Sequence, residues 1–290
     1  MLLGERGAPP AVARRFTRTI AGSEFNVAAA LSRLGVTVSI ATCLGRDSLG
    51  DAVAEDLECA MIMASVRRVE SPTGVLLRGA NGVGAMHLRH ASAATELRPA
   101  DVDDAWNEPD AVFLSGITAV RSPSASAAVL YAARRARDEG ALVVVDPNHR
   151  PALGSRADFA RALRPLRTLA DIAIGDRDEL ADLAGTTPRG AVPVLLESGC
   201  RLVIAKLGAD GAIAYDGTTQ HEVRSLARAV VDTVGAGDAF AAGVLFGAAR
   251  GLSVPASLQL GSTLAAHVVE TLGDIQGLPD LISTTSGVDR

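Results

Sequence analysis

The sequence predicts an α/β protein with a mostly parallel sheet covered by helices and a small β element inserted into it. From Asn26 onward, apolar helical patterns alternate with short β-branched runs, which is typical of βαβ units. Between Val66 and Arg89 the pattern changes to short strand-like pieces broken by turn residues. The chain has 290 residues, of which 48% are hydrophobic, so it is long and apolar enough to bury such a core.

The expected strands are short, and the expected helices follow most of them. We expect strands at 37–41, 111–115, 142–146, 171–174, 202–206 and 212–215. We expect helices at 26–34, 49–58, 123–139, 156–170, 177–183, 238–250 and 254–271. In the inserted element, Asn81-Gly82 is typical of a hairpin turn. Ligands of open parallel sheets bind outside the carboxyl ends of the strands, so polar residues at those ends are the first site candidates.

Charge, hydropathy and cysteine content narrow the function classes. A net charge of −5 argues against a nucleic-acid partner, which would need a basic patch. The sequence has no apolar run of about eighteen residues and no leader pattern, which predicts a cytoplasmic protein without a membrane partner. The 3 cysteines lack the spacing of a metal site, so we expect reduced, structural thiols.

The most informative stretch, residues 231–243, combines a glycine-rich turn, a helix start and one acid. Gly235 and Gly237 permit backbone conformations that side chains forbid, and the apolar run after Asp238 predicts a buried helix. The first amides of that helix have no intrahelical partner, so they form an anion site where Asp238 could accept a proton. These residues alone leave open an ordinary helix in which Asp238 is only a capping residue.

Two segments resemble the signatures of the PfkB-type (ribokinase-like) carbohydrate kinases. Residues 232–240 read D-T-V-G-A-G-D-A-F and resemble the second signature without a gap. Residues 21–35 resemble the first signature, with Ala21 where a glycine is usual. The resemblance implies a ribokinase-like three-layer α/β/α fold, which is a doubly wound, mostly parallel sheet with a small β lid, and it implies ATP and Mg²⁺. It also implies that Asp238 is the catalytic base, beside an anion hole formed by Gly235, Ala236 and Gly237.

Two arginine-bearing segments are similar to the 2-keto-3-deoxygluconate kinase branch of this family. Residues 146–150 resemble its D-x-N-x-R element, and residues 86–94 resemble its aromatic-x-R-x-x-S-A-A element, although His87 and Leu88 replace the aromatic residues. A planar guanidinium suits a carboxylate, so the resemblance implies that Arg89 and Arg150 hold a sugar acid. Substrate contacts implied by the resemblance are Gly22, Ser23, Asn26, Arg89, Arg150, Asp238 and Asp274. Two alternatives stay open: Asp146 and Asn148 only cap the loop while Arg150 lies on the surface, and His87 or His90 is a solvated strand residue.

Further segments resemble the nucleotide side of the family. Residues 206–211 are similar to a K-x-G-x-x-G element, and residues 176–179 resemble N-x-x-E with Asp176 in place of asparagine. The resemblance implies that Glu179 organises magnesium through water. Implied nucleotide contacts are Asn148, Lys206, Gly208, Gly211, Gly235, Gly237 and Ser262. A helix start with acids favoured by the helix dipole is the open alternative for Asp176 and Glu179.

The resemblance sets the expected organisation and activity. It implies a kinase domain formed by residues 22–64 and 91–290, a β lid formed by 11–21 and 65–90, and a shortened N-terminal segment, 1–10. We expect ATP-dependent phosphorylation of a primary hydroxyl of a sugar acid, first of all 2-keto-3-deoxygluconate. One alternative is a kinase of a neutral sugar, such as a ribokinase or fructokinase. Another is a shortened, non-catalytic homologue, unless the true start lies upstream. By analogy, copies would pair through the lid as a homodimer.

Overall fold

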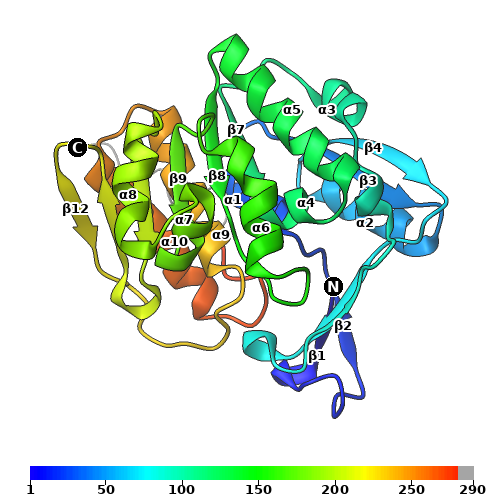
Figure 1. The fold of residues 1–290 in the computed structure, drawn as a ribbon. Helices are drawn as coiled ribbons and strands as arrows, with labels where there is room; N and C mark the ends of the chain where they lie inside the picture. The colour runs from blue at the N-terminus through cyan, green and yellow to red at the C-terminus, as the bar shows by residue number, and fades with distance from the viewer. Residues whose placement is uncertain (280–290) are drawn as a thin grey trace. The chain divides into compact units, whose positions relative to one another are not determined.

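The computed structural model describes residues 1–279, which form two compact units (Figure 1). Unit 1 comprises Met1–Ala93, Leu226–Phe246 and the described part of Gln259–Arg290. Unit 2 comprises Ala94–Ser225 and Gly247–Leu258. Each unit contains at least one β-sheet and several helices.

Unit 2 contains a 6-stranded sheet in the order β12-β11-β10-β9-β8-β7. Its strands are β7 (Ala111–Ser115), β8 (Leu142–Asp146), β9 (Ile172–Gly175), β10 (Leu202–Lys206), β11 (Ala212–Tyr215) and β12 (Gln220–Val223). Strands β7 to β10 are parallel, whereas β11 and β12 are antiparallel and form one edge. In the register, Ser115 lies opposite Asp146 and Gly175 lies opposite Ala205, so the polar strand ends meet at one edge of the sheet.

Helices pack on one face of this sheet through alternate strand residues. The helices of unit 2 are α3 (Pro99–Ala105), α4 (Gly116–Val120), α5 (Pro123–Glu139), α6 (Arg156–Leu163), α7 (Arg177–Ala184) and α8 (Pro188–Glu197). Val143, Val145 and Val203 point to the same side because strand side chains alternate, and they pack with Leu163 and Leu195 in one buried cluster. Figure 1 shows α5, α6 and α7 running along the strands of this unit.

Unit 1 contains a 4-stranded sheet in the order β2-β1-β5-β6 and a 2-stranded sheet of β3 and β4. Its strands are β1 (Leu2–Gly4), β2 (Phe16–Arg18), β3 (Ser39–Gly45), β4 (Met63–Val69), β5 (Val75–Arg78) and β6 (Met86–Leu88). Its helices are α1 (Ser23–Arg33), α2 (Ser48–Cys59), and most of α9 (Ala236–Ala249) and α10 (Val254–Val269). Ile20, Phe25, Ala28, Leu57 and Ile62 form a buried cluster between α1 and α2 and their neighbours. The first residues of the chain therefore form a strand that pairs with β2 and β5.

Side-chain caps explain where several helices begin. Ser122 accepts a hydrogen bond from the amide of Ala125 at the start of α5, and Gly140, with φ 81°, ends that helix. Asp176 and Glu179 form a reciprocal capping box at the start of α7. In each case a short polar residue precedes the apolar run of the helix, and this order in the sequence predicts where a helix begins.

Most expected elements are present, and the differences have physical causes. Helix α5 has the expected bounds, whereas α6 ends at Leu163 because Pro165 cannot continue an α-helical hydrogen-bond ladder. Helix α8 was not expected, and it contains Pro193 in its interior. Strand β12 was not expected either. Among the helices of residues 1–279, none is both long enough and apolar enough to cross a membrane.

Candidate active site

The carboxylate of Asp238 joins the two signature segments in unit 1. Asp238 lies in the first turn of α9 and is buried. Its Oδ1 atom accepts a hydrogen bond of 2.6 Å from the hydroxyl of Ser23, and its Oδ2 atom accepts one of 2.7 Å from the amide nitrogen of Asn26. Both donors lie in the first turns of α1 and are buried. The carboxylate is therefore held in one orientation by two short hydrogen bonds.

One buried acceptor atom beside this carboxylate is unused. Within residues 1–279, Oδ1 of Asn26 is buried and has no hydrogen-bond partner. A buried polar atom without a partner costs free energy, so a ligand hydroxyl at this position would satisfy it. Asn26 can thus orient Asp238 with one end of its side chain and contact a ligand with the other.

The backbone before α9 makes a tight glycine turn. Gly235 has φ +88°, and a Cβ atom on it would lie 2.2 Å from the carbonyl oxygen of Asp274. Only glycine fits there, both for its conformation and for its space. The amide of Ala236 makes a long hydrogen bond, 3.4 Å, to the carbonyl of Thr233, and α9 begins at Ala236. The positive end of the helix dipole therefore lies at Gly235–Asp238.

Asp274, an expected substrate contact, lies beside a buried arginine that the sequence did not single out. Arg78, at the end of β5, is 1% exposed and forms ion pairs with Asp274 and with Asp232, the latter at 2.7 Å. Burial raises the pKa of the Asp274 carboxyl, the guanidinium of Arg78 opposes that rise, and the nearby carboxylate of Asp238 adds to it. In the sequence, Arg78 stands out only as a charged residue directly after the apolar run at 75–77.

Three further expected residues of unit 1 are Gly22, Ser262 and Arg89. Gly22 immediately precedes α1, and Ser262 is buried on α10. A terminal nitrogen of Arg89 lies 2.6 Å from Nδ1 of His87, so His87 accepts this hydrogen bond when its Nδ1 carries no proton. His87 therefore contacts the expected substrate arginine, in place of the aromatic residue usual there.

A second cluster lies at the carboxyl edge of the sheet in unit 2. The ammonium of Lys206 is 2.7 Å from Oδ2 of Asp146 and 4.0 Å from Oε2 of Glu179. Asp146 is fully buried, and its Oδ1 atom accepts the amide of Asn148 at 3.0 Å. Asn148 has φ +45°, which turns the chain sharply after β8. The segment 146–150 and Lys206 are thus brought together, as their positions at strand ends predict.

Glu179 has a structural role at this edge. Its Oε1 atom accepts the amide of His149 and its Oε2 atom accepts the amide of Asp176, both at 2.8 Å. Each carboxylate oxygen retains capacity for a further hydrogen bond, for example to water. Arg150 is exposed and donates to the carbonyl of His149. In the described residues, no group of three or more His, Cys, Asp or Glu side chains has the arrangement of a metal site.

The two glycines expected on the nucleotide side, Gly208 and Gly211, differ in the space around their Cβ positions. Gly208 has φ +60° with open space around its Cβ position. Gly211 has φ +97°, and a Cβ there would lie 2.0 Å from the carbonyl oxygen of Val223. Gly211 therefore allows the tight connection between β10 and β11 that follows Lys206.

Comparison with known proteins decides the family. Residues 5–281 match the family model described as pfkB family carbohydrate kinase. The chain belongs to this family of carbohydrate kinases. It is 33% identical over 276 residues to a 2-dehydro-3-deoxygluconokinase of Bacillus subtilis (strain 168), a match that covers 91% of this chain and 85% of that protein.

Solved structures agree with this assignment. A PfkB protein from Polaromonas sp. JS666 is 32% identical with a TM-score of 0.80, covering 97% of this chain and 94% of that one. Aminoimidazole riboside kinase from Salmonella enterica, complexed with aminoimidazole riboside and an ATP analog, is 26% identical with a TM-score of 0.82, covering 97% and 93%. The expected ribokinase-like α/β fold and the expected class, an ATP-dependent carbohydrate kinase, are confirmed.

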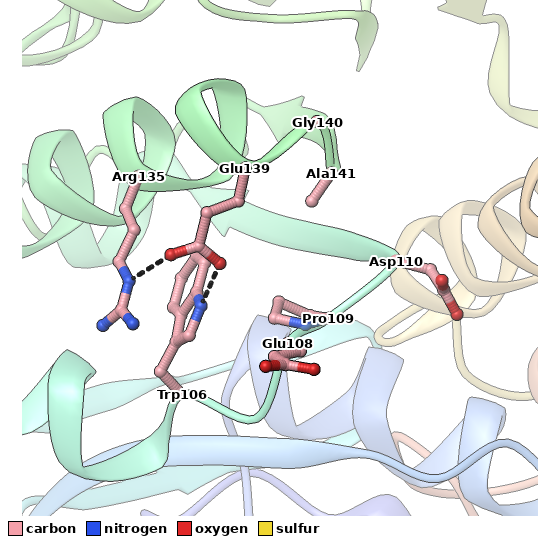
Figure 2. Close-up of a pocket in the computed structure, with 8 residues that line it drawn as sticks. All are labelled: Trp106, Glu108, Pro109, Asp110, Arg135, Glu139, Gly140 and Ala141. Atoms are coloured by element: carbon pink, nitrogen blue, oxygen red, sulfur yellow. Dashed lines mark hydrogen bonds and ion pairs between the residues drawn. The ribbon is translucent and has the colours of Figure 1, made fainter.

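A pocket of the kinase at the opposite edge of the unit 2 sheet is distinct from these clusters. Its volume is about 560 Å³, and its lining includes residues just before β7 and β8, such as Asp110 and Ala141 (Figure 2). Figure 2 shows Glu139 bound by the indole nitrogen of Trp106 and by Arg135, which also stacks on the Trp106 ring with 4.4 Å to its centroid. None of the expected site residues lines this pocket.

Proposed function

We propose that this kinase transfers the γ-phosphate of ATP to a primary hydroxyl of a sugar acid, with 2-keto-3-deoxygluconate as the leading substrate. The observation that carries the proposal is the carboxylate of Asp238, held by Ser23 and Asn26 at the start of α9. A carboxylate there can accept the proton of the attacking hydroxyl. The adjacent loop amides and helix start stabilise negative charge on the transferred phosphate.

The reaction is a direct in-line displacement. The hydroxyl oxygen of the sugar acid forms a bond to the γ-phosphorus, and the bond from that phosphorus to the β–γ bridging oxygen breaks. ADP leaves with the bonding electron pair, and the hydroxyl proton passes to Asp238. Phosphoryl transfer of this kind depends on positioning and charge stabilisation, so a fixed carboxylate and a rigid glycine loop are what the chemistry needs.

The substrate side is assigned to residues with complementary groups. The unpartnered Oδ1 atom of Asn26 would accept a hydrogen bond from a sugar hydroxyl. The guanidinium groups of Arg89 and Arg150 would bind the carboxylate of a sugar acid, because a charged, planar donor fork matches that group. Gly22 and Asp274 complete the proposed contacts. The name of the relative from Bacillus subtilis supports a keto-deoxy sugar acid.

The nucleotide side is assigned to the cluster in unit 2 and to two further groups. Lys206, Asn148, Gly208 and Gly211 would contact ATP, together with the loop glycines and Ser262. Mg²⁺, which neutralises charge on the nucleotide phosphates, fits a site with few protein ligands, because it commonly keeps its waters and binds phosphates. Both oxygens of Glu179 already accept backbone amides, so Glu179 would hold the ion through water.

A substrate panel separates this proposal from its alternatives. We would measure ADP formation with ATP, Mg²⁺ and either 2-keto-3-deoxygluconate, ribose or fructose. A pocket built to bind a carboxylate rejects substrates that lack it, so kcat/KM for the acid should be roughly 100-fold or more higher. Preference for ribose or fructose would support a neutral-sugar kinase instead. ATP binding without turnover on any sugar would support a non-catalytic homologue.

A matched pair of arginine variants tests the carboxylate contact. Arg150→Met should raise KM for the acid about 10-fold while leaving kcat/KM for neutral sugars unchanged, because only the acid loses a charged hydrogen bond. Arg161→Met removes an arginine with 77% of its side chain exposed on α6 and should match the wild type. Equal KM values for Arg150→Met and the wild type would remove Arg150 from the substrate contacts.

A further inference from the structure

We propose that Arg78 is a positioning residue for the loop that carries Asp238: from the end of β5 its guanidinium fastens that loop and the neighbouring Gly273–Asp274 segment in one arrangement. The inference rests on the proposed role of Asp238. Arg78 matches no signature segment. It holds the loop through Asp232 and the neighbouring segment through Asp274.

The guanidinium of Arg78 is buried, and both of its terminal nitrogens donate hydrogen bonds to other residues. Its side chain is 2% exposed. One terminal nitrogen donates to Oδ2 of Asp232 at 2.7 Å and to the carbonyl of Gly79 at 2.8 Å, and the other donates to Oδ1 of Asp274. A guanidinium can bind two carboxylates at once because its donors form a rigid planar fork. Arg78 thus links two buried acids from different parts of the sequence.

Asp232 is the centre to which three segments are bound. Its Oδ1 atom accepts the amides of Asn81, at 2.8 Å, and Val234, at 3.2 Å. Its Oδ2 atom accepts the amide of Gly273, at 3.1 Å, in addition to Arg78. Four donors match the capacity of one carboxylate, so this acid is fully used in structure.

A second set of contacts ties the segment after Arg78 to the same loop. The side-chain oxygen of Asn81 accepts the amide of Thr233 at 2.9 Å and its hydroxyl at 3.1 Å. Two residues further on, Gly235 packs so closely on the backbone of Asp274 that no side chain fits between them. The loop at 232–235 is therefore held both by the end of β5 and by the segment at 273–274.

This arrangement determines where α9 begins, and so where the amides at 235–237 and the Asp238 carboxylate lie. A displacement of about 1 Å at a reacting group lowers the rate by as much as ~10²-fold, so loosening this clamp would reduce kcat. The KM for ATP would change less, because Arg78 contacts Asp232, Asp274 and Gly79, none of which is a proposed nucleotide contact. A split between kcat and KM is the expected signature.

Arg78→Lys tests the inference, because lysine keeps the charge and loses the fork. We expect kcat to fall about 10-fold or more with the KM for ATP within about twofold of the wild type. Arg68→Lys is the matched control: Arg68, on β4, contacts the carbonyl of Gly45 and the carboxylate of Asp51, away from the loop. The control should retain wild-type kcat. Arg78→Ala should lose more activity and regain part of it with ethylguanidinium, which supplies the missing fork.

A readout independent of activity accompanies the kinetics. Amide hydrogen exchange at 234–237 should be about 10-fold faster in Arg78→Lys, while the amides of α2 exchange as in the wild type. A kcat per folded molecule within about twofold of the wild type, with unchanged loop exchange, would overturn the inference. Wild-type protein that fails to phosphorylate any sugar would instead count against the proposed function, and loop exchange would still decide the role of Arg78.

Discussion

Each of the two candidate clusters of the kinase pairs buried carboxylates with one cation, and the two cations differ in kind. In unit 1 the fork of Arg78 binds Asp232 and Asp274, and its side chain is 2% exposed. In unit 2 Lys206, the only lysine of the chain, binds Asp146 and is 20% exposed. An arginine fork fixes the directions of its partners, whereas an ammonium is a compact charge on a flexible stem.

This difference corresponds to the proposed roles of the two clusters. Proton transfer at Asp238 requires fixed geometry, which the Arg78 network supplies at the loop before α9. Nucleotide binding requires a positive charge that can follow incoming phosphates, which the stem of Lys206 allows. On these proposed roles, buried charge would serve rigidity in one cluster and adaptable contact in the other, so substitutions in the two clusters should have different effects.

A large change in stability is expected from Lys206→Met. The substitution removes the cation 2.7 Å from Oδ2 of the fully buried Asp146. Removing one partner of a buried pair should cost about 3 kcal/mol, which corresponds to a fall in Tm of roughly 6 °C or more. Thermal unfolding monitored by circular dichroism measures this change, and KM for ATP should rise alongside it.

The double variant Asp146→Asn/Lys206→Met is the control for the pair. It removes the negative charge together with the cation, so its Tm should lie above that of Lys206→Met. An equal Tm for the single and double variants would show that the pair itself contributes little, and the contrast between the clusters would then lose its electrostatic basis.

A smaller difference in stability and kcat is expected between two glycine variants, one from each cluster. Gly235→Ala introduces a Cβ atom 2.2 Å from the carbonyl of Asp274 at φ +88°, so we expect a loss of about 2 kcal/mol and a fall in kcat of about 10-fold. Gly208→Ala meets open space at φ +60° and should cost only about 1 kcal/mol, with kcat nearly unchanged. If the two variants had the same kcat, the rigidity assigned to the loop before α9 would be wrong.

Sequence patterns predicted the elements whose signals are local. The helix at 123–139 has the expected bounds because Ser122 caps its start and Gly140 ends it, and the strand at 142–146 has them because its β-branched run ends at a charged residue. Helix α8 escaped prediction because Pro193 lies inside an otherwise helical run. The end of α6 could have been predicted, because Pro165 is visible in the sequence and lies inside the expected helix at 156–170.

The residues of the candidate site also differ in how strongly the sequence indicates them. Ser23, Asn26 and Asp238 carry motif signals, and the structure brings their side chains within hydrogen-bond distance. Arg78 carries almost none, because its role comes from partners 154 and 196 positions away in the sequence. For Glu179 the sequence offers a helix start with acids favoured by the helix dipole as an alternative, whereas its two backbone hydrogen bonds appear only in the folded chain.

The most direct test of the account is the turnover of Asp238→Asn on the best substrate of the panel. We predict that kcat falls by about 10²- to 10⁴-fold, because the proton of the attacking hydroxyl loses its acceptor, while ATP binding by calorimetry stays near the wild-type value. Asp104→Asn, which changes an exposed acid on α3, should retain full activity. Turnover of Asp238→Asn within about threefold of the wild type would contradict the role of Asp238 as the base.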